Sequence, residues 1–348
     1  MSSFWIQTED WHTAGEPFRI VPDLPAGSLA PGLTVAEQRQ HIIDTSQHPL
    51  DLLRQSLCHE PRGHADMYGG FILPPNDANA HFGVLFWHKD GFSTACGHGT
   101  IALGAWAIAN GIVKFPSHLD HESHINVVVD VPSGRVTARA HITNGEATHF
   151  DFVNVASYAL PDLDRTLDIM LNSHRRRCHV EMAFGGAVYA AVDVRSLDMT
   201  IDPKRHLDFI DVQRQIKTQL KDCNHLGKYD VYGVIFYEHM ASTDTTVTQR
   251  NVVVFADGQI DRSPCGSGTS ARIALLLKQS QLTVDQTLVH HSILGTTFEA
   301  GVEALTTDVN APDVPVCIPF VRGMANLTAR CSFFIDPNDP IYPGFLFR

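Results

Sequence analysis

The sequence contains no long apolar run, no signal-peptide pattern and no excess of positive charge. No stretch reaches the roughly 18 consecutive apolar residues of a membrane-spanning helix, and the first residues lack the basic-then-apolar order of a signal peptide. The 348 residues carry 26 Lys and Arg against 38 Asp and Glu, a formal net charge of −12. Nucleic acids and anionic membranes attract basic surfaces, so neither is expected as a partner.

Cysteine use is sparse and shows no redox pattern. Seven cysteines lie at scattered positions, and no two of them form a Cys-x-x-Cys pair. This predicts reduced thiols in a cytoplasmic protein, and it weighs against a thiol redox function without excluding one. A lone cysteine is most often a small buried apolar residue, which is the interpretation adopted for Cys58, Cys178, Cys223, Cys317 and Cys331.

Standard metal and dinucleotide motifs are also missing. Neither His121-Glu122-Ser123-His124 nor His290-His291 matches a common ligand spacing, so no metal is expected despite the 20 histidines. Gly97-x-Gly99 followed by Gly104 is not the dinucleotide fingerprint, because the third glycine is misplaced and no βαβ unit is evident.

Two stretches share the pattern Cys-Gly-x-Gly-Thr, and each leads into an apolar segment of helical character. One begins at Cys96 and the other at Cys265, about half the chain later. A duplicated pattern predicts two similar halves, each presenting one thiol at the start of a helix. The glycines let the backbone approach the thiol, or a bound molecule, closely.

A helix start favours an anion, because its first N–H groups lack partners in the helix and carry partial positive charge. We therefore expect a lowered thiol pKa at Cys96 and Cys265, and the same N–H groups could bind a substrate carboxylate. Two opposed thiols suit inversion of a carbon next to a carboxylate, since one removes a proton and the other supplies one to the opposite face. His98 and Asp261 could tune these thiols or bind a substrate ammonium, although Asp261 could instead cap a turn.

The remaining pattern predicts many short strands and one central helix in each half. Helices are expected from the capping box at Thr34 onward, with a break at Pro49, and over about 98–110, 204–222 and 268–279. Strands are expected just after the turn at Gly15 and Pro17 and at 67–73, 81–87, 125–131, 135–142, 179–184, 187–194, 229–237, 251–255 and 298–305, and the end, 331–347, is expected to be a strand with proline-rich turns. This order favours α+β lobes over alternating βαβ units, with a boundary between residues 154 and 164.

The sequence resembles the proline racemase family over nearly its whole length. The residues that carry the resemblance are Asp10-x-His12-Thr13-x-Gly15-Glu16-Pro17, Glu60-Pro61-Arg62-Gly63, Cys96-Gly97-His98, Asn154-Val155-x-Ser157, Ala183-Phe184-Gly185-Gly186 and Asp261-Arg262-Ser263-Pro264-Cys265-Gly266. The last of these motifs is the most specific.

The resemblance implies an α+β fold of two pseudo-symmetric lobes, like that of diaminopimelate epimerase. Each lobe would be a mostly antiparallel sheet or barrel around a central helix, with the active site between lobes. Residues 1–155 with about 330–348 would form one lobe and 156–329 the other. The resemblance also implies a homodimer and chemistry at Cα of proline or a hydroxyproline that needs no metal, pyridoxal phosphate or other cofactor. The implied proton acceptor and donor are Cys96 and Cys265, and the implied substrate contacts are Gly97, His98, Asp261, Gly266 and Ser267.

The residue at the second thiol position separates branches of this family. Proline racemases and 4-hydroxyproline 2-epimerases have a proton-transfer residue at both positions, whereas trans-3-hydroxyproline dehydratases typically have Thr at the second. Cys265 fits the first group, while Met67-Tyr68-Gly69-Gly70 and Ile101-Ala102-Leu103-Gly104 resemble the second. We expect an enzyme acting on trans-3-hydroxy-L-proline with 2-epimerase activity, dehydratase activity or both. A 4-hydroxyproline 2-epimerase, a proline racemase and a catalytically silent amino-acid-binding protein stay open.

Overall fold

The computed structural model describes residues 2–114, 123–227 and 229–347. The chain forms two compact units, Met1–Asp151 with Met324–Arg348 (unit 1) and Phe152–Gly323 (unit 2). Each unit combines mostly antiparallel strands with helices, so the expected two-lobed α+β fold is confirmed. Among the described residues, every helix is too short or too polar to cross a bilayer.

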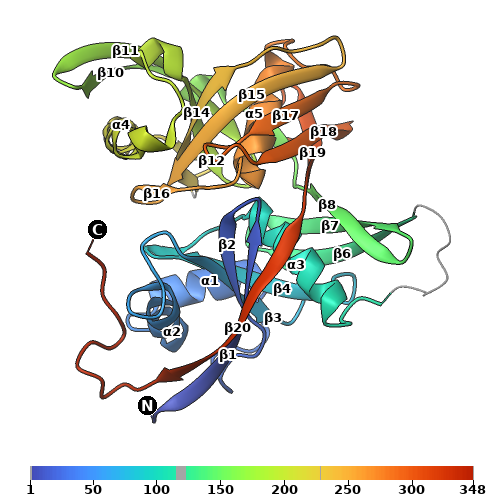
Figure 1. Ribbon diagram of the computed structural model, residues 1–348, viewed down its shortest axis with the longest axis vertical. Coiled ribbons are helices and arrows are strands. Elements are labelled where there is room, and N and C mark those ends of the chain that lie inside the picture. The colour runs from blue at the N-terminus through green and yellow to red at the C-terminus, as the bar shows by residue number, and fades with distance from the viewer. Residues whose placement is uncertain (1, 115–122, 228, 348) are drawn as a thin grey trace. The chain divides into compact units, whose positions relative to one another are not determined.

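Unit 1 is built on a sheet that joins the two ends of the chain. The hairpin of β1 (Phe4–Thr13) and β2 (Glu16–Val21) pairs with β20 (Ala325–Ile335), so red and blue strands lie side by side in Figure 1. The sheet continues through β3 (Tyr68–Leu73), β4 (Phe82–His88), β6 (Ser123–Val131) and β7 (Gly134–Thr143). Two further strands are β5 (Gly91–Phe92) and β8 (Glu146–Val153).

Three helices belong to unit 1. Helix α1 (Val35–Asp44) begins with the predicted capping box, in which the Thr34 hydroxyl accepts from the Glu37 N–H. Helix α2 (Pro49–Cys58) begins at Pro49, as the proline predicts. Helix α3 (Gly97–Ala109) is buried along most of its length, and Gly104 lets it approach Ala138 of β7 and Phe150 of β8.

Unit 2 repeats the arrangement around a second buried helix, α5 (Gly266–Lys278). Helix α4 (His206–Gln219) is half exposed and packs near β10, β14 and β15 (Figure 1). The strands of this unit are β9 (Ser157–Ala159), β10 (Arg165–Leu171), β11 (His174–Phe184), β12 (Val188–Asp193), β13 (Asn224–His225), β14 (Tyr229–His239), β15 (Thr246–Phe255), β16 (Gln259–Ile260), β17 (Thr287–His291), β18 (Thr297–Thr306) and β19 (Val316–Gly323). Short 3-10 turns occur at Pro161–Leu163, Val194–Leu197 and Pro203–Arg205.

Most predicted elements are confirmed to within a few residues, and the predicted last strand with its proline-rich turns is present but starts before residue 331. It begins at Ala325 and ends at Ile335, and the remaining residues up to 347 form turns and a short bridge. The prolines at 337, 340 and 343 cannot donate to a sheet, which explains the early end. Strands β1, β5, β8, β9, β10, β13, β16, β17 and β19 were not predicted.

Candidate active site

The Cys96 thiol caps the N-terminus of α3. Its sulfur accepts a hydrogen bond from the backbone N–H of Gly99 at 3.2 Å, and only 5% of the residue is exposed. A Cβ at position 99 would lie 2.8 Å from this sulfur and 2.5 Å from the Phe18 ring. Glycine at this position is therefore what allows the helix N–H to reach the thiol, and the predicted placement at a helix start is observed.

His98 lies beside the Cys96 sulfur. Its Nδ1 atom is 3.4 Å from Sγ, and its backbone carbonyl accepts from the Thr13 hydroxyl at 2.8 Å. Burial lowers the pKa of His98 to about 3, and the hydrogen bond from its ring to the Pro17 carbonyl opposes this only partly. The imidazole is therefore neutral near pH 7 and offers the site a polar group without charge. Gly97, the first residue of α3, is also buried.

The Cys265 thiol occupies the matching position at the start of α5. Its sulfur accepts from the Gly268 N–H at 3.3 Å, and a Cβ on Gly268 would meet the sulfur at 3.0 Å. Unlike Cys96, this residue has a φ of +65°, a conformation that costs a non-glycine residue free energy. Two contacts support it, from the Cys265 N–H to the Ser263 hydroxyl at 3.1 Å and from the Asn251 amide to the Pro264 carbonyl at 2.7 Å.

Asp261 both caps the turn before Cys265 and interacts with its thiol. One carboxylate oxygen accepts from the Ser263 N–H at 2.8 Å and from the Ser263 hydroxyl at 2.7 Å. The carboxylate and the Cys265 thiol also interact, since each shifts the pKa of the other. Burial raises the pKa of Asp261 to about 6, although these hydrogen bonds act in the opposite direction. Turn capping and tuning of the thiol are therefore combined in one side chain.

The expected lowering of the pKa is wrong for Cys265. Burial raises the pKa of this thiol well above its ordinary value, and the negative charge of Asp261 raises it further. The Gly268 N–H lowers the pKa, as a helix start should, but desolvation of a fully enclosed thiolate outweighs one hydrogen bond. In this state Cys265 holds its proton, which is the form a proton donor requires.

A tyrosine that sequence reasoning missed completes the surroundings of Cys265. The Tyr189 hydroxyl lies 2.7 Å from the Ser267 hydroxyl and 3.8 Å from the Cys265 sulfur. The only signal in the sequence is a single tyrosine within the run Val188–Val192, which is otherwise valine and alanine. Gly266 and Ser267 form the first turn of α5 and are buried. Unit 1 has a comparable tyrosine, Tyr68, whose ring centroid lies 5.1 Å from that of His98.

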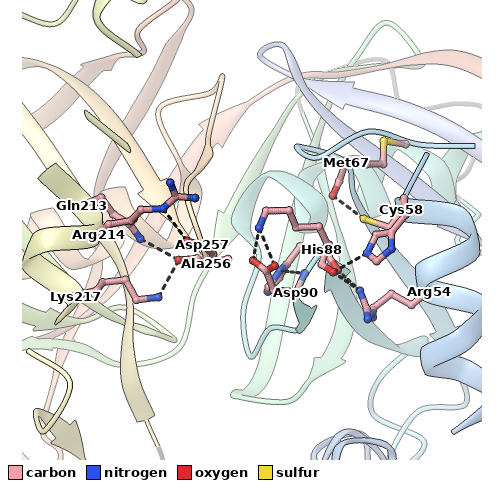
Figure 2. Close-up of polar contacts among 12 residues, drawn as sticks. Arg54, Cys58, Met67, His88, Asp90, Gln213, Arg214, Lys217, Ala256 and Asp257 are labelled. Atoms are coloured by element: carbon pink, nitrogen blue, oxygen red, sulfur yellow. Dashed lines mark hydrogen bonds and ion pairs between the residues drawn. The ribbon is translucent and has the colours of Figure 1, made fainter. Parts of the chain in front are cut away.

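In unit 1, a helix holds the hairpin turn that leads into the Cys96 segment. Arg54 of α2 donates to the carbonyls of His88 and Lys89, at 2.8 and 2.7 Å, in the turn between β4 and β5 (Figure 2). Arg54 is itself fixed by Asp51 at 2.7 Å. The chain runs from this turn through β5 directly to Cys96.

In unit 2, different residues hold the turn that leads to Cys265. Gln213 and Lys217 of α4 both donate to the Ala256 carbonyl at 2.9 Å, and Arg214 pairs with Asp257 at the same distance (Figure 2). This turn joins β15 to β16, from which the chain continues to Asp261 and Cys265. Each unit therefore braces the hairpin before its thiol with a peripheral helix.

Two other motifs of the family resemblance meet at α5. The Asn154 amide donates to the Gly185 carbonyl at 2.8 Å. A Cβ on Gly185 would lie 2.5 Å from the Ser267 carbonyl and 2.7 Å from the Ala271 nitrogen. The glycine after β11 is thus needed for close contact with the helix that carries Cys265.

Comparison with known proteins identifies the family. The sequence model named Proline racemase matches residues 9–346, almost the entire chain. The chain belongs to the proline racemase family. Its members named here are enzymes, and so is this chain, an enzyme of the racemase, epimerase and dehydratase group.

Two curated relatives have different activities in their names. A trans-3-hydroxy-L-proline dehydratase from Bacillus thuringiensis subsp. konkukian is 36% identical over 353 residues, covering 97% of both chains. A 3-hydroxyproline 2-epimerase from Burkholderia multivorans is 35% identical over 355 residues, covering 99% of this chain and 98% of its own. Among solved structures, a probable proline racemase from Agrobacterium radiobacter K84 with bound carbonate is 26% identical, with a TM-score of 0.84 over 98% of this chain and 96% of its own.

Proposed function

We propose that this protein removes the Cα proton of trans-3-hydroxy-L-proline, with Cys96 and Cys265 as a cofactor-independent acid/base pair. The observation that carries the proposal is the duplicated cap, since each unit presents one buried thiol to the first N–H groups of its own helix. Thiols that act on opposite faces of one carbon can take a proton from one side and return one to the other. The two relatives named for 3-hydroxyproline chemistry support this substrate.

Proton removal leads to two products. One thiolate takes the Cα proton and leaves a carbanion that the substrate carboxylate stabilises. Protonation of the opposite face by the other thiol gives the 2-epimer. Alternatively the carbanion expels the 3-hydroxyl, which leaves as water when a thiol supplies a proton, and the enamine tautomerises to Δ1-pyrroline-2-carboxylate. Because Cys265 holds its proton, it can supply that proton either to the carbanion or to the leaving hydroxyl.

The other predicted site residues have roles that follow from their chemistry. The helix-start N–H groups at Gly97 and Gly266 are suited to a carboxylate. The Asp261 carboxylate is suited to the substrate ammonium, since it is buried and carries negative charge when ionised. His98 and Ser267 supply uncharged polar contacts beside the two sulfurs.

Heavy-water NMR with three substrates tests the proposal. Purified enzyme is incubated separately with trans-3-hydroxy-L-proline, trans-4-hydroxy-L-proline and L-proline, and Cα deuteration and new products are followed. We expect deuterated 2-epimer, Δ1-pyrroline-2-carboxylate or both from the 3-hydroxy compound alone. Reaction only with the 4-hydroxy compound or proline would assign a 4-hydroxyproline 2-epimerase or a proline racemase. Binding detected by calorimetry without any Cα exchange would indicate a catalytically silent amino-acid-binding protein.

A further inference from the structure

We propose that unit 1 carries a Zn²⁺ site on the outer face of its β6–β7–β8 strands, formed by His141, His149 and Asp151 with His124 as a fourth ligand. The sequence predicts no metal, because its histidine pairs match no common ligand spacing, and the residues proposed here lie on three different strands. Folding is what brings them onto one surface. The site is independent of the proposed reaction.

Strand register places the four side chains on the same face. His124 of β6 is directly opposite His141 of β7, and opposite residues of an antiparallel pair project to the same side with Cβ atoms about 4.5–5.5 Å apart. His149 and Asp151 are two residues apart on β8, so they also share a face. The His141 and His149 rings are stacked with centroids 4.2 Å apart.

The donor atoms converge closely enough for one ion. One ligand atom from each of His141, His149 and Asp151 lies within 4.8 Å of the others. His141 Nε2 is already 2.7 Å from Asp151 Oδ2. Zinc bonds of about 2.0–2.2 Å place neighbouring tetrahedral ligands roughly 3.3 Å apart. Binding therefore needs the His141–Asp151 pair to open and the His149 ring, which is nearly parallel to that of His141 (21°), to tilt so that its nitrogen points at the same ion.

The chemistry of this set suits zinc. Imidazole nitrogens and a carboxylate are the ligands that zinc shares with other borderline divalent metals. The Asp151 side chain is only 4% exposed, whereas His141 is 27% exposed, so a buried negative charge lies under a rim open to solvent. A divalent cation would neutralise that charge, and the proton between His141 and Asp151 would leave as the metal binds.

The site is distinct from the thiol of its own unit. Helix α3, which begins at Cys96, packs against the other face of these strands, where Gly104 meets Ala138 and Phe150. Residues 138 and 150 alternate with 141, 149 and 151 along their strands, so the two sets project to opposite sides. A metal here would stabilise the sheet under α3 without contacting the reacting groups.

Zinc titration of the full chain after chelator treatment tests the site. We expect one tight Zn²⁺ by calorimetry and a higher melting temperature with zinc. His149→Gln, a half-buried and conservative change, removes a direct ligand and should weaken binding by at least about 100-fold, the upper end for residues that only hydrogen-bond to a metal ligand, whereas His124→Gln should weaken it less. His179→Gln, an exposed strand histidine of unit 2, is the matched control and should change nothing.

Cobalt substitution separates this site from the thiols. Bound Co²⁺ should give the visible bands of tetrahedral nitrogen and oxygen ligation, and these should be lost in His149→Gln. Thiolate-to-metal charge-transfer bands, unchanged affinity in His149→Gln, or the absence of tight zinc binding would each overturn the proposal. In the last case the cluster is a hydrogen-bonded His–Asp pair with a stacked imidazole.

Discussion

The hydroxyl groups of Tyr189 and Ser267 lie 2.7 Å apart, although the residues are 78 positions apart in the chain. Tyr189 also reaches the Cys265 sulfur at 3.8 Å, and this contact lowers the pKa of a thiol that burial has raised. The tyrosine is fully buried, and burial holds its own pKa well above the ordinary value, so it remains a hydrogen-bond donor. Cys265 therefore has one neighbour, Asp261, that stabilises its thiol and another, Tyr189, that stabilises its thiolate.

Removing the Tyr189 hydroxyl should slow proton transfer. Tyr189→Phe keeps the packed ring but loses a hydrogen bond to the thiolate, so the Cys265 pKa should rise further. We expect kcat to fall about tenfold, the size expected for one hydrogen bond to a charged group, with the larger loss in the direction that uses Cys265 as base. Initial rates of epimerisation, measured from the substrate and from its 2-epimer, show the size of the loss in each direction. Tyr232→Phe, whose ring packs edge-on against Tyr189, is the control and should retain the wild-type rate.

Replacing the second thiol should separate the two activities. Cys265→Thr places a hydroxyl that does not ionise near neutral pH where a proton must be delivered to the carbanion. We expect epimerisation to fall at least about 10²-fold, while dehydration to Δ1-pyrroline-2-carboxylate continues. Chiral chromatography with NMR of the product measures both. Cys331→Thr on β20 is the matched control, and epimerisation that survives in Cys265→Thr would refute the two-thiol scheme.

The pH dependence of kcat/KM should report Asp261. The carboxylate must be ionised to bind a substrate ammonium, and its raised pKa of about 6 predicts a loss of activity as the pH falls through 6. His98 cannot cause this fall in activity, because burial lowers its pKa to about 3. His98→Gln should therefore lower the rate but keep the fall in kcat/KM below pH 6. Asp261→Asn should remove most of the activity, and the activity that remains should no longer fall through pH 6. A fall in kcat/KM that disappears in His98→Gln would contradict the assignment.

Arg54 should affect the rate through the turn it holds. Arg54→Met leaves two backbone carbonyls without their donor and should cost about 2–3 kcal/mol of unfolding free energy. If the turn positions Cys96, kcat should also fall, and Arg54→Lys should restore part of it. Chemical denaturation and steady-state kinetics measure the two effects. A destabilised Arg54→Met enzyme with the wild-type kcat would limit this residue to folding.

Two further variants serve as comparisons for the Arg54 experiment. Gln213→Met removes a matched brace in unit 2 and tests the turn before Cys265. Arg195→Met removes an ion pair in which the Arg195 side chain is 70% exposed, and should change stability by less than about 0.5 kcal/mol.

Local signals account for the elements that could be predicted. The capping box at Thr34, the proline at 49 and the paired Cys-Gly-x-Gly stretches act over three or four residues, and the helices begin where these signals place them. Strands β10 and β17 were missed because their patterns are weak, and their pairing depends on partners elsewhere in unit 2. The glycine at 185 matches a family motif, but its reason, contact with Ser267 and Ala271, became visible only in the fold.

The sequence by itself determined the family and the presence of two thiols at helix starts, because a glycine-flanked helix cap is a short-range feature. Only the tertiary structure decided how those thiols behave. Burial reversed the expected direction of the Cys265 pKa, Tyr189 entered from a distant strand, and His141, His149 and Asp151 came together on one sheet face. Desolvation and side-chain contacts of this kind depend on packing between segments far apart in the chain, and no local pattern encodes them.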